Sequence, residues 1–200
     1  MIIEHLFYTT AIAIIVGMLF FRVTGRDSSW IIILCTYLPD LDKVIGRVID
    51  YAGFTLLFQG HPIQHGAFHT IAMMVVFGII MAFLLHPFGI RFFDGMVFSM
   101  IGVGAHLFED ALVYPSNYMY LWPIYPEKTG LAWLPTGLNE ESYSSNFFHI
   151  ANTEVLVIGI ILVIIAAAIR TYVEGYGWIR WYMPEKFYRK YFGKQKPEVR

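Results

Sequence analysis

The chain of 200 residues is long enough for one compact domain or for a small helical membrane protein. Hydrophobic residues make up 57% of it and charged residues only 14%, against about 25% charged residues in a typical soluble domain, so the composition favours lipid as the solvent. The net charge of −1 points to no class of charged partner, and the single cysteine, Cys35, excludes an internal disulfide framework and a cysteine-based zinc site.

Four stretches are long and apolar enough to cross a bilayer as helices, which takes about 20 residues. They are 6–24, 67–87, 92–113 and 154–172. A fifth, Trp30–Leu38 within 28–39, is too short to cross alone and can cross with its flanks or re-enter. The sequence therefore predicts an all-α polytopic bundle of about four to five transmembrane helices. An irregular aromatic loop precedes the last span, and we divide the chain into a membrane domain, 1–172, and a basic aromatic tail, 173–200.

The distribution of charge predicts the orientation of these spans. We expect a multi-pass protein of the cell membrane (inner or plasma membrane). The tail 173–200 carries seven basic and three acidic side chains, so its C-terminus is expected on the cytoplasmic side. Its mixture of cations and aromatic rings is typical of a segment on anionic lipid, and no nucleic-acid partner is expected. The acidic connection 114–152 then lies outside, together with the start of span 67–87 and the end of span 92–113.

Ionisable side chains occur at the ends of the apolar stretches, although a charge at membrane depth costs about 2.5–3.5 kcal/mol on insertion scales. In "GAHLFEDAL", His106 and Asp110 are four residues apart, so a helix places them on one face. Such a pair is either a hydrogen-bonded structural pair or two ligands of one metal ion.

Histidines at four-residue spacing open the second span, in "HPIQHGAFH". Because proline is tolerated in the first turn of a helix, we expect His61 at or before the helix cap. His65 and His69 are then one turn apart on one helical face. They are either polar cap residues or metal ligands.

The remaining polar elements are His5 and the two aspartates of "YLPDLD". Pro39 ends the preceding helix, and Asp40 and Asp42 follow in the next turn. They either form an Asx turn after the helix or act as metal ligands, and the sequence favours neither. If the segment 28–39 crosses the membrane, all candidate metal ligands lie at its outer face: His5, Asp40, His65, His69, His106 and Asp110.

Taken in order, these elements resemble the YdjM-type inner-membrane proteins, a family described as metal-dependent hydrolases. The resemblance rests on His5, "LPDLD" (38–42), "QHGAFHT" (64–70), "HLFEDAL" (106–112) and "YLWPIYP" (120–126), and covers most of residues 1–135. The chain departs from the family in three places. The arginine after the first histidine of 64–70 is missing, the two histidines there are one residue closer, and "VYP" replaces a threonine after the aspartate motif.

A more distant similarity to zinc-dependent phospholipase C and its nuclease relatives implies roles for these residues. By that similarity Asp40, one of His65 and His69, His106 and Asp110 hold one metal, while His5 and Asp110 hold part of a second. Histidine and aspartate without thiolates suit Zn²⁺, one or two ions, or Mn²⁺. The expected catalytic carboxylates are Asp40 and, as base or orienting group, Asp42.

The leading hypothesis is an integral-membrane hydrolase that cleaves a phosphoester or a lipid head group with a metal-activated water. Tyr118, Tyr120, Trp122, Tyr125 and Trp133 are either an interfacial aromatic belt, which we favour, or a lid that guides a lipid head group. One alternative is a non-catalytic metal-binding membrane protein, such as a sensor, a transporter or a regulatory partner. Transport is disfavoured because the ionisable groups lie at helix ends and not at mid-membrane. Another alternative is an interaction protein that binds through its tail.

Overall fold

The computed structural model describes residues 2–58, 60–114, 118–131, 133, 153–183 and 185–191. Four helical stretches are long and apolar enough to span a membrane: α1 (Ile2–Thr24), α4 (Ile71–Leu85) continued by a 3-10 turn to Phe88, α5 (Phe92–Val113) and α6 (Thr153–Glu174) continued by a 3-10 helix to Trp181. The shorter elements are α2 (Trp30–Cys35), α3 (Leu41–Tyr51), the hairpin strands β1 (Leu57–Phe58) and β2 (His61–Pro62), η1 (His86–Phe88), η3 (Gly175–Trp181) and α7 (Glu185–Tyr191). The prediction of an all-α membrane bundle is confirmed, with four spanning helices among the described residues.

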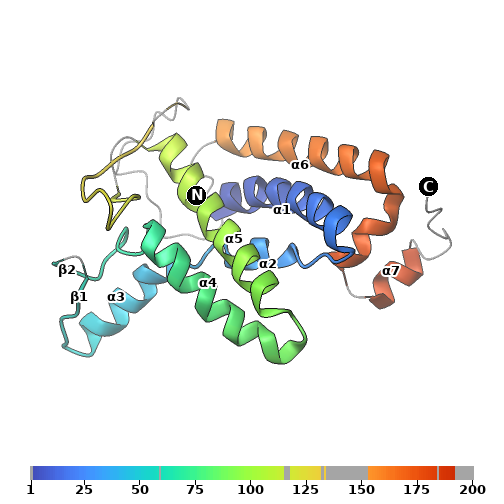
Figure 1. Cartoon of the computed structure of the whole chain (residues 1–200). Coiled ribbons are helices and arrows are strands. Elements are labelled where there is room, and N and C mark those ends of the chain that lie inside the picture. The colour runs from blue at the N-terminus through green and yellow to red at the C-terminus, as the bar shows by residue number, and fades with distance from the viewer. Residues whose placement is uncertain are drawn as a thin grey trace.

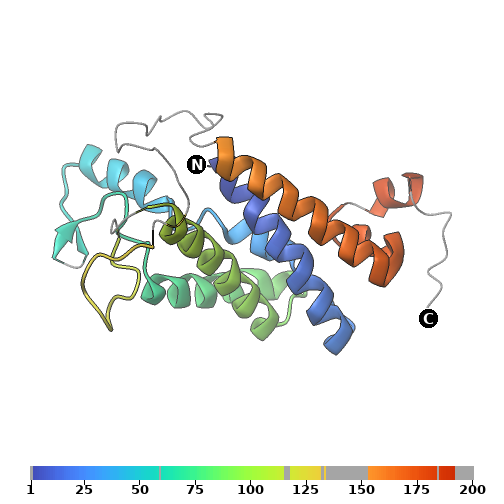
Figure 2. The same ribbon diagram turned by 90° about the horizontal axis from the view of Figure 1, so that it is seen from above.

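The long helices form two packed pairs (Figure 1). α1 and α6 lie side by side and run in the same direction. Gly159, early in α6, packs against Phe7, and Arg170, later in α6, donates to the carbonyl oxygen of Ile14, later in α1. α4 and α5 form an antiparallel hairpin joined by η1. As a result α1, α4 and α6 begin at one end of the bundle, where α5 ends (Figure 2).

α5 is the central helix of the bundle. Of its candidate span 56% is buried, against 17% for that of α4 and 22% for that of α6. α4 and α6 instead expose large apolar side chains such as Phe83, Leu84, Ile164 and Ile165. In a membrane protein these outer faces meet lipid chains, so their exposure carries no cost in water.

The segment between α1 and α3 runs back along α5. Near its start Arg26 pairs with Asp94 in the first turn of α5 (Nε–Oδ2 3.0 Å), and near its end Asp40 lies with His106. α2 covers the middle and buries Ile31, Ile32 and Cys35 fully. Its six residues span about 9 Å, too little to cross a bilayer core of about 30 Å. The whole segment, and not α2 alone, returns the chain to the end where α1 begins.

The predicted helical placement of His65 and His69 is wrong. α4 begins only at Ile71, where the Thr70 side chain caps it by accepting from the Met73 amide (3.1 Å). Gly66 has a φ of 98°, a left-handed conformation that ends any helical run there. His65 and His69 therefore lie in the turn segment 63–70.

Two smaller expectations at this end of the bundle are also corrected. His61 is exposed in strand β2 and is not a helix cap. Asp40 occupies the N-cap position of α3 without a side-chain capping bond, so the chain continues into a helix where an Asx turn was considered.

At the far end of the bundle Arg170 is fully buried. Its guanidinium pairs with Asp27 (2.5 Å) and Glu174 (3.0 Å). The hydroxyl of Tyr182 hydrogen-bonds to Ser29 and donates to the Ala13 carbonyl oxygen (3.0 Å). This network packs residues 175–182, the first part of the predicted tail, on the bundle. Much of the charge on which the predicted orientation rests, Glu140, Glu141, Lys194, Lys196 and Arg200, lies outside the described residues.

Candidate metal centre

Ionisable side chains from four segments converge at the end of the bundle where α1 begins. They come from α1 (His5), the start of α3 (Asp40 and Asp42), the turn 63–70 (His65 and His69) and the last part of α5 (His106 and Asp110). They form three overlapping groups whose potential ligand atoms lie within 4.8 Å of one another: His5, His106 and Asp110; Asp40, His69 and His106; Asp42, His65 and His69. All six predicted metal ligands, together with Asp42, are thus brought into one cluster.

The centre of this cluster is a triangle of donor atoms. His69 Nε2 lies 3.2 Å from His106 Nε2 and 3.4 Å from Asp110 Oδ2, and the third edge, His106 Nε2 to Asp110 Oδ2, is 3.5 Å. Ligand atoms about 2.0–2.2 Å from a tetrahedral ion lie about 3.3–3.6 Å from one another. The triangle therefore has the dimensions of one face of a tetrahedral zinc site.

The protonation of this triangle also suits metal binding. Two imidazole nitrogens that face each other cannot both donate a hydrogen without repulsion. Neutral imidazole and carboxylate are donors that Zn²⁺ accepts, so the residues present fit the implied ion.

Asp110 presents its two oxygens to different partners. Oδ2 faces the triangle, while Oδ1 lies 3.5 Å from His5 Nε2. His5 also stacks on the His106 ring at a centroid distance of 4.0 Å. His5 and the Oδ1 atom of Asp110 would therefore be the groups to contribute to a second ion.

Glu109 is a member of the site that sequence reasoning missed. Its Oε2 lies 2.8 Å from His5 Nδ1, and its side chain is 1% exposed. A carboxylate on one imidazole nitrogen fixes the tautomer and leaves the other nitrogen as an acceptor. The signal in the sequence was an acidic residue beside Asp110 inside an otherwise apolar helix.

Asp42 holds the turn that carries both histidines. Its Oδ2 accepts from the amides of Gly66 (2.8 Å) and Phe68 (3.3 Å), while the Nδ1 atoms of His65 and His69 lie 3.4 Å and 3.3 Å from its carboxylate. Burial opposes the charge of Asp42, but the two imidazoles that face its oxygens outweigh this and hold the pKa of Asp42 below its usual value. Both oxygens are occupied, so the geometry favours an orienting role.

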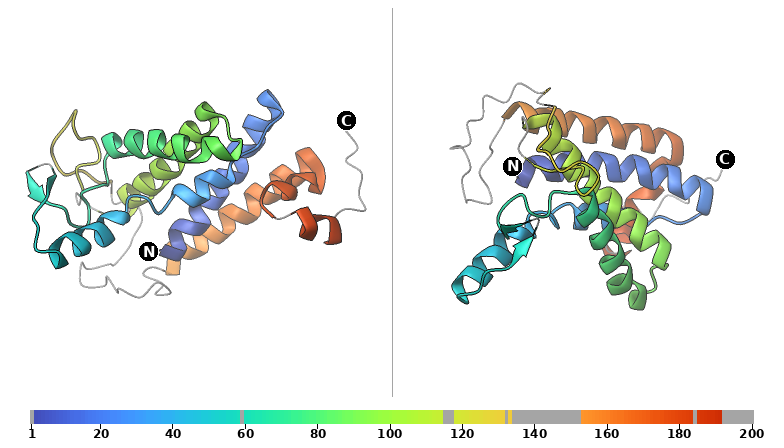
Figure 3. Two further views of the ribbon diagram at one scale, coloured as in Figure 1. Left: turned by 90° about the horizontal axis from the view of Figure 1, so that it is seen from below. Right: turned by 60° about the vertical axis from the view of Figure 1, so that its left-hand side comes forward.

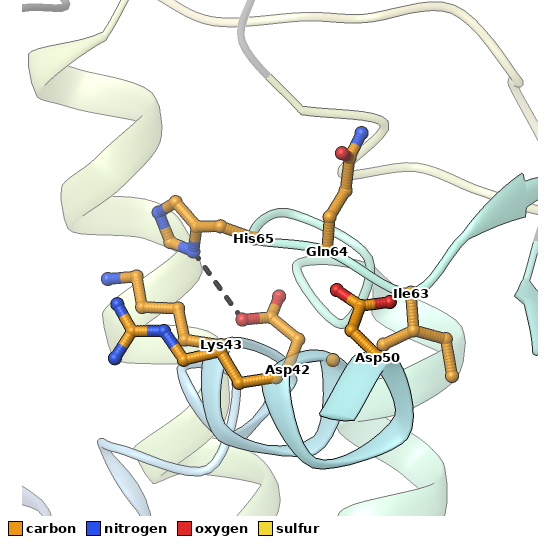
Figure 4. Close-up of a pocket in the computed structure, with 8 residues that line it drawn as sticks. Asp42, Lys43, Asp50, Ile63, Gln64 and His65 are labelled. Atoms are coloured by element: carbon orange, nitrogen blue, oxygen red, sulfur yellow. Dashed lines mark hydrogen bonds and ion pairs between the residues drawn. The ribbon is translucent and has the colours of Figure 1, made fainter. Parts of the chain in front are cut away.

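Asp40 lies at the more open side of the cluster. Lys43 pairs with it (2.9 Å), and His65 Nδ1 lies 3.7 Å away. Burial disfavours its charge, but His106 and Lys43 outweigh that effect and lower the pKa of Asp40. Figure 4 shows the adjoining cleft, with Lys43, Gln64 and His65 on its walls and the contact between His65 and Asp42.

The predicted aromatic belt is wrong for two of its members. Tyr118 and Tyr120 are 8% and 7% exposed and pack in a core with Phe68 and Phe77. The Tyr118 hydroxyl lies 2.8 Å from His65 Nε2, so this side chain is a wall of the site. Trp133, in contrast, is 72% exposed, as an interfacial residue would be.

Comparison with curated proteins and with solved structures gave no match to this chain. Comparison with protein families gave one, over almost the whole length. It agrees with the family resemblance carried by the histidine and aspartate motifs and with the four apolar helices of a multi-pass membrane protein. Residues 1–180 match the family described as YdjM inner membrane protein, and the chain therefore belongs to that family.

Proposed function

We propose that this protein is an integral-membrane, metal-dependent hydrolase that cleaves a phosphoester, on a lipid head group or on another membrane-located substrate. The observation that carries the proposal is the donor triangle of His69, His106 and Asp110, with edges of 3.2–3.5 Å. Membrane proteins rarely bury such groups without a function or a charge partner.

The residues of the cluster divide into those that would hold a metal and those that would orient its ligands. His69, His106 and Asp110 would hold one ion, and His5 with the second oxygen of Asp110 would contribute to another. Asp42 and Glu109 face the Nδ1 atoms of His69 and His5 and so direct both Nε2 atoms inward. A bound Zn²⁺ would supply a water with a pKa of about 7 and polarise a phosphoryl oxygen.

The open side of the cluster indicates where a substrate would approach. Asp40 and His65 have side chains that are 17% and 28% exposed, while His69 is fully buried. Asp40 is therefore the most exposed carboxylate of the cluster and would be the one to take a proton from a water at its open side. The buried histidines behind it would contact metal only.

We also propose that the metal centre faces the outer side of the membrane and that the C-terminus is cytoplasmic. The basic tail is the basis of this orientation. Since α1, α4 and α6 all begin at the metal centre, the orientation of one of them fixes the others (Figure 2). Modification of a cysteine placed in the exposed hairpin by a membrane-impermeant thiol reagent, applied to intact cells, tests this.

Metal analysis and turnover of purified protein test the proposal together. We expect about one bound ion or more in the parent, loss of metal in His106→Ala and Asp110→Ala, and no change in His61→Ala, a matched control at an exposed histidine outside the cluster. The parent should hydrolyse a phospholipid or a model phosphodiester. Metal without turnover would favour the non-catalytic alternative, and a metal-free parent or unchanged metal in both variants would refute both.

A further inference from the structure

α3 has an apolar face that no described element covers. Leu41, Val44, Ile45 and Val48 are 37–62% exposed, and their spacing places them in one stripe along the helix. The opposite side is packed, because a Cβ on Gly46 would lie 2.5 Å from the Ile63 carbonyl oxygen. In a membrane protein such a stripe fits the boundary between head groups and acyl chains.

The position of α3 in the fold agrees with this placement. α3 and the β1–β2 hairpin project together from the end of the bundle that carries the metal centre (Figures 1 and 3). The apolar surface continues beyond the helix, where Phe54, Leu56 and Leu57 are 55–69% exposed. α3 therefore separates an apolar surface from the cleft beside the metal ligands.

The cleft behind α3 is small, and both basic and acidic side chains line it. Figure 4 shows Lys43, His65, Asp42 and Asp50 on its walls. Arg47 lines it as well, and its volume is about 210 Å³. Sites for drug-sized ligands have about 300–1,000 Å³, so this cleft suits a small group such as a phosphate. Arg47 is exposed and makes no ion pair with any described residue, although Asp50 also lines the cleft.

Arg47 connects the apolar stripe to the cleft. It follows Val44 by three positions, so it borders the stripe on the helix surface. A guanidinium offers paired N–H donors that match phosphate oxygens. Lys43, one turn earlier, lies between Arg47 and Asp40, to which it is bound at 2.9 Å. A molecule with its chains against the stripe could place an anionic group in the cleft within one helix diameter, about 10 Å.

We propose that the cleft binds the phosphate of an anionic membrane phospholipid through Arg47 and Lys43, and that the apolar stripe of α3 lies in the bilayer interface beside it. The lipid then reaches the metal centre from the side of the membrane. The assignment of this lipid as a substrate rests on the proposed hydrolase function. Binding of the lipid itself requires no metal.

Protection of a cysteine in the cleft tests the lipid site in full-length, metal-free protein. Gln64→Cys introduces an exposed thiol, whereas Cys35 is fully buried, so its background reaction is slow. We expect dihexanoyl phosphatidylglycerol to slow maleimide labelling several-fold more than dihexanoyl phosphatidylcholine. Inorganic phosphate at the same concentration should have little effect.

Two charge variants in this background identify the binding group. Arg47→Gln should abolish the protection by phosphatidylglycerol, and Arg22→Gln, an exposed arginine at the far end of α1, should preserve it. Equal protection by phosphatidylcholine or by inorganic phosphate, or protection that persists in Arg47→Gln, would overturn the proposal. Protection without turnover would refute the hydrolase alone, and turnover without protection would refute the lipid site alone.

The membrane contact of α3 has its own readout. A bimane label at Val48→Cys, in vesicles that contain doxyl-labelled phosphatidylcholine, should be quenched more strongly than the same label at Asp50→Cys on the opposite face. Equal quenching at the two positions would show that the stripe does not lie in lipid and would overturn this part of the proposal.

Discussion

The Nε2 atoms of His69 and His106 lie 3.2 Å apart although 37 positions separate the two residues. His69 belongs to a turn held by Asp42, and His106 to the buried helix α5. The contact therefore exists only in the folded bundle, and both nitrogens face Asp110.

This relationship predicts that His69 matters more for metal binding than His65. His69→Ala removes a donor of the central triangle, so the affinity for Zn²⁺ should fall by more than the 10–100-fold typical of outer partners of a metal site. His65 Nε2 is engaged by Tyr118, and His65→Ala should stay within that range. Competition titration with a chelating dye measures both, with His61→Ala as control. Equal losses at positions 65 and 69 would contradict the assignment.

The second prediction concerns Glu109 as the partner of His5. Glu109→Ala should weaken binding of the ion next to His5 by about 10–100-fold, because the imidazole loses the carboxylate that fixes its tautomer. Glu109→Gln keeps an acceptor and should restore much of this affinity. Stepwise Zn²⁺ titration by calorimetry distinguishes the two variants. A merely structural glutamate would lower the melting temperature of the metal-free protein and leave metal affinity unchanged.

The sequence was sufficient for the spanning helices because their signal is local. Runs of apolar residues predicted 92–113 with the bounds that α5 has, and the i,i+4 spacing correctly placed His106 and Asp110 on one face. α3 was missed because it is short and half polar, so no long apolar run marks it. Which side of this amphipathic helix is packed and which is exposed follows only from its contacts with the rest of the fold.

The turn that carries His65 and His69 could not be predicted from spacing. Two histidines four residues apart occur both in helices and in irregular turns, so their spacing alone does not identify the structure. What decides here is the left-handed conformation of Gly66 and the capture of two amides by Asp42, which lies 24 positions earlier. The return of residues 25–40 along α5 likewise depends on long-range contacts such as that of Arg26 with Asp94.

The third prediction follows from the crowding at Gly66. A Cβ there would lie 2.6 Å from the Tyr118 ring, and φ is 98°, so Gly66→Ala should lower stability and metal affinity together. Gly60→Ala is the matched control, since Gly60 has a φ of 80° but open space around it. Backbone strain of about 1–2 kcal/mol applies to both variants, and only Gly66→Ala adds a clash. Thermal unfolding and metal titration should separate them; identical behaviour would argue against a packed turn.

The fourth prediction is a pH dependence of stability in metal-free protein. The pKa of Asp42 is lowered in the folded state, so its ionised form stabilises the fold. That contribution is fully present above the unfolded value of about 3.9 and is lost as the pH falls through the folded pKa. The melting temperature of the parent should therefore fall below about pH 4 more steeply than that of Asp42→Asn. Parallel curves for parent and variant would exclude Asp42 as the titrating group.

The last prediction separates the two polar networks of the bundle. Arg170→Met leaves the carboxylate of Asp27 buried without its ion-pair partner, which should cost about 3–5 kcal/mol in the free energy of unfolding. Arg170→Met combined with Asp27→Asn removes the stranded charge and should recover much of that loss. Because Arg170 lies at the end of the bundle away from His5, metal stoichiometry of the folded fraction should match the parent in both variants. Denaturation in detergent and metal analysis provide the two readouts. Loss of metal at unchanged stability would show that the two ends of the bundle are coupled.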